Sequence, residues 1–130
     1  MVFLRALAAT AALVLSVACS DPPLQLANIQ TGRSLNPDRS IASITTLFKP
    51  SETIYVSVQT TGTAPGKIGV KWMYQGRLID EPVKQVDYDG PASTDFQLQN
   101  SGGFPEGDYS VEILINGAAV GTRNFKVGPP

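Results

Sequence analysis

Few side chains in this sequence could perform chemistry, and nearly all of them are carboxylates. The 130 residues contain no histidine and a single cysteine, Cys19. Hydrolytic triads, cysteine nucleophiles and the usual zinc or iron sites depend on those residue types. We therefore predict that the chain is not an enzyme, with no catalytic residue, no bound metal and no cofactor.

The carboxylates could still support one kind of reaction. They form three close pairs, which are Asp80 with Glu81, Asp87 with Asp89, and Glu106 with Asp108. A glycosidase needs only two carboxyl groups, so a small carboxylate-based periplasmic enzyme is the alternative function. Such a site also needs a cleft that excludes water, which one small domain rarely offers. Residues 87–90 resemble part of a calcium loop but lack its other ligands, so we assign residues 87–91 to a turn.

The start of the chain predicts export. Arg5 is the only charged residue among the first 18, and residues 6–18 are mostly apolar, which is the anatomy of a signal peptide. This stretch is shorter than the roughly 20 residues that a membrane-spanning helix needs. The prolines at positions 22 and 23 would end any helix.

Ser16-Val17-Ala18-Cys19 resembles the lipobox of bacterial lipoproteins, although Ser16 stands where that family usually has leucine. The resemblance implies cleavage after residue 18, lipid on Cys19, and a membrane anchor. Acylation would also account for a lone thiol in an oxidising compartment. Cleavage by ordinary signal peptidase is the alternative, and it would give a secreted soluble binding or inhibitor domain. Because Ser20 and not aspartate follows the cysteine, similarity to Gram-negative lipoproteins favours the outer membrane, facing the periplasm, over the inner membrane.

After a lipidated tether over residues 19–23, the sequence predicts one β domain over residues 24–130. Twelve glycines and ten prolines separate short runs rich in valine, isoleucine, threonine and aromatic residues, a pattern typical of short strands. We expect strands over residues 24–30, 41–48, 53–61, 67–74, 77–87, 94–98, 109–115 and 120–127. We expect a loop over residues 100–108, after the strand 94–98, and another loop over residues 61–66. Pro82 indicates an edge strand or a break.

Two turns and a bulge follow from local residue types. Asn116-Gly117 favours a type I′ hairpin, because both residues tolerate a positive φ, and Gln75-Gly76 also fits a tight turn. Val120 is out of phase with the later inward residues of its strand, so we predict a bulge near Gly121.

Trp72 and the segment Gly107-Asp108-Tyr109-Ser110-Val111 resemble the immunoglobulin-like and fibronectin-like sandwiches. The resemblance implies that Tyr109 opens the penultimate strand and binds nearby backbone through its hydroxyl, while Trp72 packs under a sheet as structural core. Both could instead be ordinary core aromatics. The inter-sheet cysteines of antibody domains are absent, with Val111 at one of their places. The expected fold is all-β, a single immunoglobulin-like β-sandwich of about seven to eight antiparallel strands.

The charge pattern argues against nucleic acid as a partner. Without Arg5 the chain carries 9 basic and 11 acidic side chains, and the basic ones are scattered. The expected function is a non-catalytic cell-envelope binding or assembly module. Its partners would be the membrane, through the lipid, and an unidentified envelope protein or glycan. Recognition would use the loop over residues 100–108, an open edge around residues 77–87, or an aromatic patch that includes Tyr55, Tyr74 and Tyr88.

Overall fold

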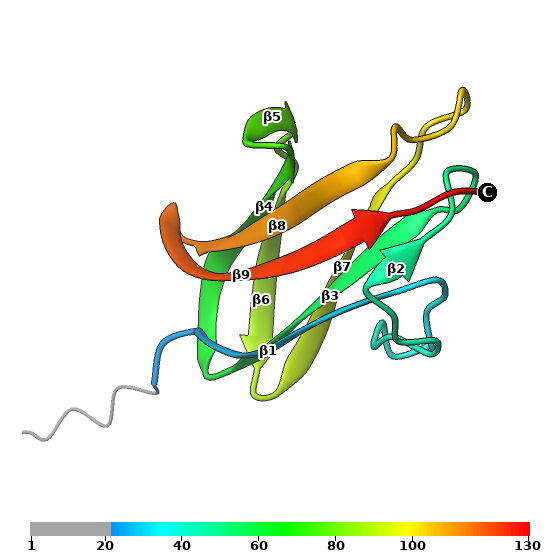
Figure 1. The fold of residues 1–130 in the computed structure, drawn as a ribbon. Helices are drawn as coiled ribbons and strands as arrows, with labels where there is room; N and C mark the ends of the chain where they lie inside the picture. Colours follow the sequence, from blue (N-terminus) through cyan, green and yellow to red (C-terminus); the bar gives the residue numbers. More distant parts are fainter. Residues whose placement is uncertain (1–21) are drawn as a thin grey trace, which may run out of the picture.

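The computed structural model describes residues 22–130 as a β-sandwich (Figure 1). The predicted signal peptide and the predicted acylation of Cys19 lie outside the described residues. No helix within the described range is long and apolar enough to cross a membrane. The strands are β1 (Gln25–Gly32), β2 (Leu47–Phe48), β3 (Ile54–Thr61), β4 (Thr63–Tyr74), β5 (Arg77–Asp80), β6 (Val83–Asp89), β7 (Ala92–Leu98), β8 (Gly107–Ile115) and β9 (Ala118–Val127).

The strands form two sheets. One has the order β1-β3-β7, and the other has the order β2-β9-β8-β4, with β5 and β6 both paired to β4. Placing β1, β3 and β7 opposite β4, β8 and β9 is the division found in immunoglobulin-like sandwiches. The predicted fold class is therefore confirmed. All the pairings are antiparallel except that of β2 with β9, which is parallel.

Alternation along the strands builds the core. In β8 every second side chain from Tyr109 to Ile115 is buried, and in β4 Ile68, Val70 and Trp72 are each fully buried. Successive side chains of a strand point to opposite faces, so one face of each sheet is apolar. Those two faces meet inside the sandwich and form one continuous core.

The predicted turns and bulge are confirmed. Asn116 and Gly117 both have positive φ, 52° and 85°, and Gln75 and Gly76 have φ of 48° and 80°. In the last hairpin Ile113 pairs with Gly121 while Leu114 pairs with Ala119, which leaves Val120 as the extra residue of the bulge.

The break predicted at Pro82 is also present. β5 and β6 pair with successive parts of β4, so they form one interrupted strand along the edge of the sheet. At the break the carbonyl oxygen of Pro82 accepts a hydrogen bond from Val70 N–H at 3.0 Å. We refer to the two strands together as the β5–β6 edge.

The strand predicted over residues 41–48 is wrong for most of its length. Only Leu47–Phe48 forms a sheet strand, β2. Ile41 and Ile44 instead make isolated bridges, to Leu35 and Gly32 respectively. The β-branched residues here are explained by a small hairpin, residues 33–44, that folds back on the sandwich. We call this segment the covering hairpin.

The two predicted loops over residues 61–66 and 87–91 are largely strand. β4 begins at Thr63 and pairs with β6, which continues to Asp89. Thr63 N–H donates to Pro22 O at 2.9 Å, and Lys67 N–H donates to the Asn116 Oδ1 atom at 2.9 Å. Pro65, between them, has no N–H to satisfy, so this half of β4 is stable without a neighbouring strand on that side.

The first described residues also pack more closely than a free tether would. A Cβ atom on Gly62 would lie 2.1 Å from the carbonyl oxygen of Pro23. The chain therefore enters the fold against the turn between β3 and β4. The first described residues and the C-terminus lie at opposite ends of the molecule (Figure 1).

Candidate binding surface

Trp72 and Tyr109 both lie in the core, with exposed fractions of 0% and 3%. The Tyr109 hydroxyl donates to the carbonyl oxygen of Pro105 at 2.6 Å, the contact implied by the resemblance to immunoglobulin-like domains. Tyr74 adds a second bond of this kind, to the carbonyl oxygen of Glu106 at 2.9 Å. The two tyrosines thereby hold the loop between β7 and β8.

The environment of Tyr109 also alters its acidity. Burial, and to a lesser extent the neighbouring Tyr74, raises the pKa of the Tyr109 phenol to about 12. A higher pKa keeps the phenol protonated, so it can donate its hydrogen bond through most of the alkaline range. Both tyrosines therefore have structural roles.

The carboxylate pairs do not gather into one site. Asp80 and Glu81 lie at the break in the β5–β6 edge, and Asp87 and Asp89 lie on β6 near the opposite end of β4. Asp108 forms an exposed ion pair with Lys126 at 3.6 Å. Within residues 22–130 no group of three potential ligands is placed to hold a metal ion. The aromatic side chains are also dispersed, since Tyr74 and Tyr88 pack against the core and Tyr55 lies on the other sheet.

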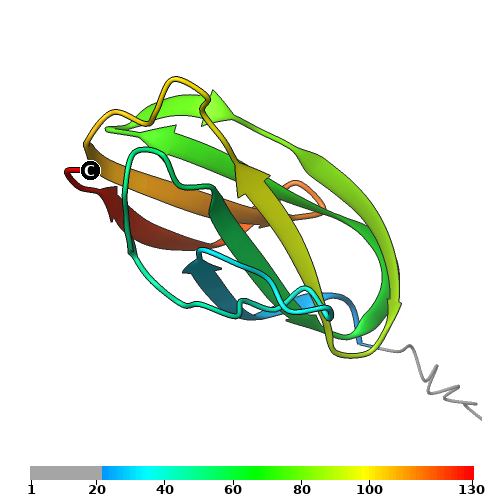
Figure 2. The same cartoon turned by 90° about the vertical axis from the view of Figure 1, so that its right-hand side faces the viewer.

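The outer face of the β1-β3-β7 sheet is covered. The covering hairpin lies against this sheet (Figure 2), and the Ser57 hydroxyl donates to the carbonyl oxygen of Arg39 at 2.8 Å. Ser57 is fully buried although it points away from the core, and Ile41 of the hairpin is 5% exposed. We call this surface the covered face.

The outer face of the other sheet has no such cover in the described part of the chain. Leu78 pairs with Met73, and Val83 pairs with Gly69, so their side chains lie on this outer side. Leu78 and Val83 are 52% and 58% exposed. Exposed large apolar side chains that gather on one face often mark an interaction surface. We call this surface, on β4, β5, β6 and β8, the open face.

The open face is hollowed along β4. One hollow of about 280 Å³ has apolar walls from Val83 and Leu114 and is flanked by Lys67, Lys71 and Glu81. Gly69 forms the floor of this hollow. A Cβ atom added to Gly69 would lie 3.2 Å from the Val83 Cγ2 atom.

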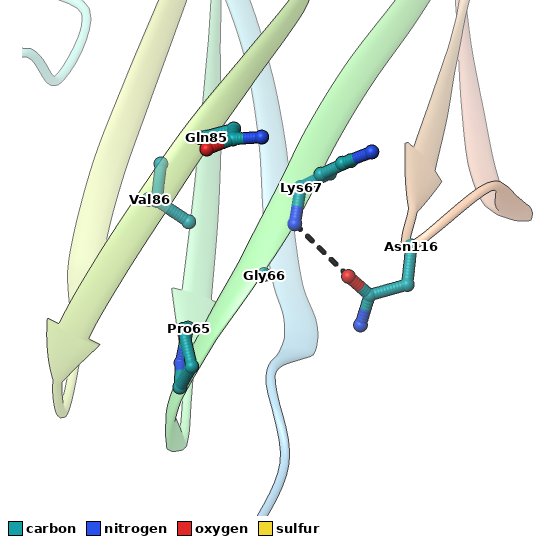
Figure 3. A pocket seen from close by; sticks show the side chains of 6 residues that line it. All are labelled: Pro65, Gly66, Lys67, Gln85, Val86 and Asn116. Atoms are coloured by element: carbon teal, nitrogen blue, oxygen red, sulfur yellow. Dashed lines mark hydrogen bonds between the residues drawn. The ribbon is translucent and has the colours of Figure 1, made fainter.

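A second hollow, of about 460 Å³, continues from Lys67 toward the end of β4 where the chain enters the fold. Figure 3 shows Gln85 and Val86 on β6 at one side, and Asn116 of the β8–β9 turn at the other. The hydrogen bond from Lys67 N–H to Asn116 Oδ1, drawn as a dashed line, joins β4 to this turn. Both hollows are only partly enclosed, which suits contact with an extended chain better than enclosure of a small molecule.

The edge position was predicted from the sequence, but the apolar residues of the open face were not. Pro82 indicated the edge correctly. Leu78, Val83 and Leu114 were not singled out, because apolar residues at alternate positions are equally typical of a buried face. The signal that could have separated them is the acidic residues interspersed along residues 77–89.

Comparisons with known proteins give no family for this chain. No family model matches it, and no curated protein matches it. Among solved structures it is similar to the CARDB domain of the PF1109 protein from Pyrococcus furiosus, in complex with di-metal ions, with 11% identity, a TM-score of 0.49, and coverage of 85% of this chain and 90% of that chain. It is also similar to the alkylpurine DNA glycosylase AlkC of Pseudomonas fluorescens, with 15% identity and a TM-score of 0.37. That match covers 76% of this chain, which spans only 30% of the glycosylase chain.

Proposed function

We propose that this chain is a non-catalytic binding module of the bacterial cell envelope, anchored by lipid on Cys19 and recognising an envelope protein through its open face. The lipobox-like sequence before Cys19 supports the anchor. The observation that carries the binding role is the contrast between the two outer faces, because one is covered by the chain itself and the other exposes Leu78 and Val83 beside a hollow.

The position of the chain entry is consistent with such an anchor. Only two residues separate Cys19 from Pro22, whose carbonyl oxygen is bonded to Thr63. A short connection of this kind keeps a domain close to the bilayer surface. More than one acyl chain on a single cysteine gives stable membrane attachment.

Metabolic labelling with a fatty acid tests the anchor. The wild-type chain should incorporate the label and sediment with membranes, and Cys19→Ser should do neither. A Ser20→Asp variant should keep the label but move from the outer to the inner membrane, since it recreates the retention signal of the resembled family. An unlabelled, soluble wild-type chain would contradict the anchor and favour the secreted alternative.

Site-specific photocrosslinking in intact cells tests the binding surface. A photoreactive residue at Val83 should give one defined adduct with an envelope protein. The matched control is the same residue at Asn36, which is exposed on the covering hairpin and should give none. The same adduct from both positions, or an adduct with glycan only, would contradict recognition of a protein by the open face.

A further inference from the structure

The sandwich has four sheet edges, and they differ in whether a basic side chain caps their backbone groups. One sheet ends in β1 and β7, and the other ends in β2 and the β5–β6 edge. An edge strand presents unpaired backbone N–H and C=O groups that can pair with another chain. Proteins commonly protect such edges with charged side chains. The contacts at each edge therefore indicate which edges are protected against pairing with another strand.

The β1 edge is capped by an arginine from the other sheet. The Nε atom of Arg123 donates to the carbonyl oxygen of Ile29 at 3.1 Å. Its Nη2 atom donates to the Asn28 Oδ1 atom at 3.3 Å, which orients the guanidinium group. A strand that approached β1 from outside would have to displace this side chain.

The β2 edge has the same protection. The Nη2 atom of Arg33 donates to the carbonyl oxygen of Leu47 at 2.8 Å, and the Glu52 carboxylate holds its Nε atom at 2.6 Å. β2 is also only two residues long, and short edge strands are poor templates for pairing.

The β7 edge is capped by a lysine that comes from β6. The Nζ atom of Lys84 donates to the carbonyl oxygen of Asp95 at 2.5 Å and lies 4.9 Å above the Phe96 ring. The Asp95 carboxylate lies 3.8 Å from this ammonium group and 3.8 Å from the Arg39 guanidinium group. Lys84, the only lysine of β6, thus protects the edge of β7 and not the edge of its own strand.

The β5–β6 edge differs from the other three. Within residues 22–130, no lysine or arginine side chain donates a hydrogen bond to a carbonyl oxygen of β5 or β6. Its acidic residues, Asp80, Glu81, Asp87 and Asp89, are all exposed. None of them forms an ion pair with another described residue. The edge is therefore uncapped, acidic at Asp87 and Asp89 on β6, and bordered by the apolar side chains of the open face.

We propose that an extended segment of a partner protein, carrying lysine or arginine at alternate positions, adds to the β5–β6 edge as a further strand. This deepens the proposed function, on which it rests, by naming the partner's chemistry. Backbone pairing would supply affinity. Basic side chains would lie beside Asp87 and Asp89, and an apolar side chain would lie beside Val83 and its hollow.

The probe is a short synthetic peptide. Its odd positions are threonine, positions 2 and 4 are lysine, and positions 6 and 8 are valine. An antiparallel approach would place the lysines beside Asp89 and Asp87 and the last valine beside Val83. Calorimetric titration uses the full acylated chain in detergent micelles. Two control peptides carry either glutamates in place of the lysines or N-methyl groups on alternate backbone nitrogens. We expect both controls to bind at least about tenfold more weakly, a difference of about 1.4 kcal/mol.

Variants of the chain complete the test. Val83→Lys should weaken binding of the lysine peptide at least about tenfold, because it places at this edge the kind of cation that protects the other three. The matched control is Val120→Lys, which changes an exposed valine on the β9 bulge and should leave binding within about twofold. Replacing Asp87 and Asp89 together with asparagine should abolish the preference for lysine over glutamate peptides, whereas Asp108→Asn should not.

Each outcome decides between defined alternatives. Equal binding of the N-methylated peptide would show attraction of charge without strand pairing, and would overturn the proposal. Equal weakening by Val83→Lys and Val120→Lys would also overturn it. If the peptide does not bind but fatty acid is incorporated, only the proposed strand addition is contradicted. If fatty acid is not incorporated but the peptide binds, only the proposed lipid anchor is contradicted.

Discussion

The covered face and the open face reverse the usual relation between polarity and burial. On the covered face Ser57 is polar and fully buried, while on the open face Leu78 and Val83 are apolar and more than half exposed. A buried polar group needs a partner, and the covering hairpin supplies one through the Arg39 carbonyl oxygen. One sheet is thus covered within the chain, and we propose that the other is covered by a partner.

Detaching the cover should have the largest effect on this contrast. A Cβ atom at Gly32 would lie 2.2 Å from the carbonyl oxygen of Ser43 and 2.3 Å from Ile41 Cγ2. Gly32→Val should therefore displace the hairpin and lower the free energy of unfolding by about 3 kcal/mol. Limited proteolysis should then cut within residues 33–44. Gly76→Val is the control for strain without a clash, since nothing lies within 4 Å there although its φ is positive; it should leave the hairpin protected.

Alkaline pH should loosen the loop that joins the two sheets. The pKa of Tyr109 is raised to about 12 in the fold, above the value of about 10 for an unfolded tyrosine. Its contribution, on the order of 2 kcal/mol, is therefore present below pH ~10 and is lost as the pH rises through ~12. Chemical denaturation at several pH values should show this loss in wild type and much less in Tyr109→Phe. If Tyr55→Phe removed it equally, the assignment to Tyr109 would be wrong.

Removing one serine hydroxyl should lower the free energy of unfolding more on the covered face than on the open face. Ser57→Ala leaves the Arg39 carbonyl oxygen without its donor and should cost about 1 kcal/mol. Amide exchange should accelerate in the covering hairpin and stay unchanged in β4 and β6. Ser110→Ala, on the open face, provides the matched comparison and should cost less than about 0.5 kcal/mol.

The smallest effect on stability is expected on the open face itself. Leu78→Ser together with Val83→Ser should change the free energy of unfolding by less than about 1 kcal/mol, because both side chains are more than half exposed. The same variant should lose the photocrosslinked adduct of the wild type. A large drop in the denaturation midpoint would mean that these residues are structural, and would undermine the open face as a binding surface.

Local patterns predicted the parts of the fold that depend on few residues. Asn116-Gly117 sets a turn through its own φ preferences, and the phase change at Val120 requires a bulge whatever the neighbours are. The alternation around Trp72 and Tyr109 likewise specified core positions without knowledge of the partner strands.

The parts that could not be predicted depend on distant partners. Residues 63–66 resemble a loop by composition. They form a strand because they pair with β6 and because Pro22 and Asn116 accept the hydrogen bonds of Thr63 N–H and Lys67 N–H. Residues 41–46 resemble a strand, yet the face on which they pack becomes available only after β1 and β3 have paired. The candidate surface was hidden for a similar reason, since exposed and buried apolar residues follow the same period along a strand.

With Cys19 acylated as we propose, the hydrogen bond between Pro22 and Thr63 would limit how far each part of the β5–β6 edge can lie from the bilayer. With lipid on Cys19, the chain before Pro22 can extend at most roughly 11 Å. Asp89 pairs with Thr63 beside this point, whereas Leu78 pairs with Met73 near the far end of β4. A strand of this length spans roughly 40 Å. Height above the membrane would then select which part of a partner's extended segment meets the acidic residues and which part meets the apolar ones.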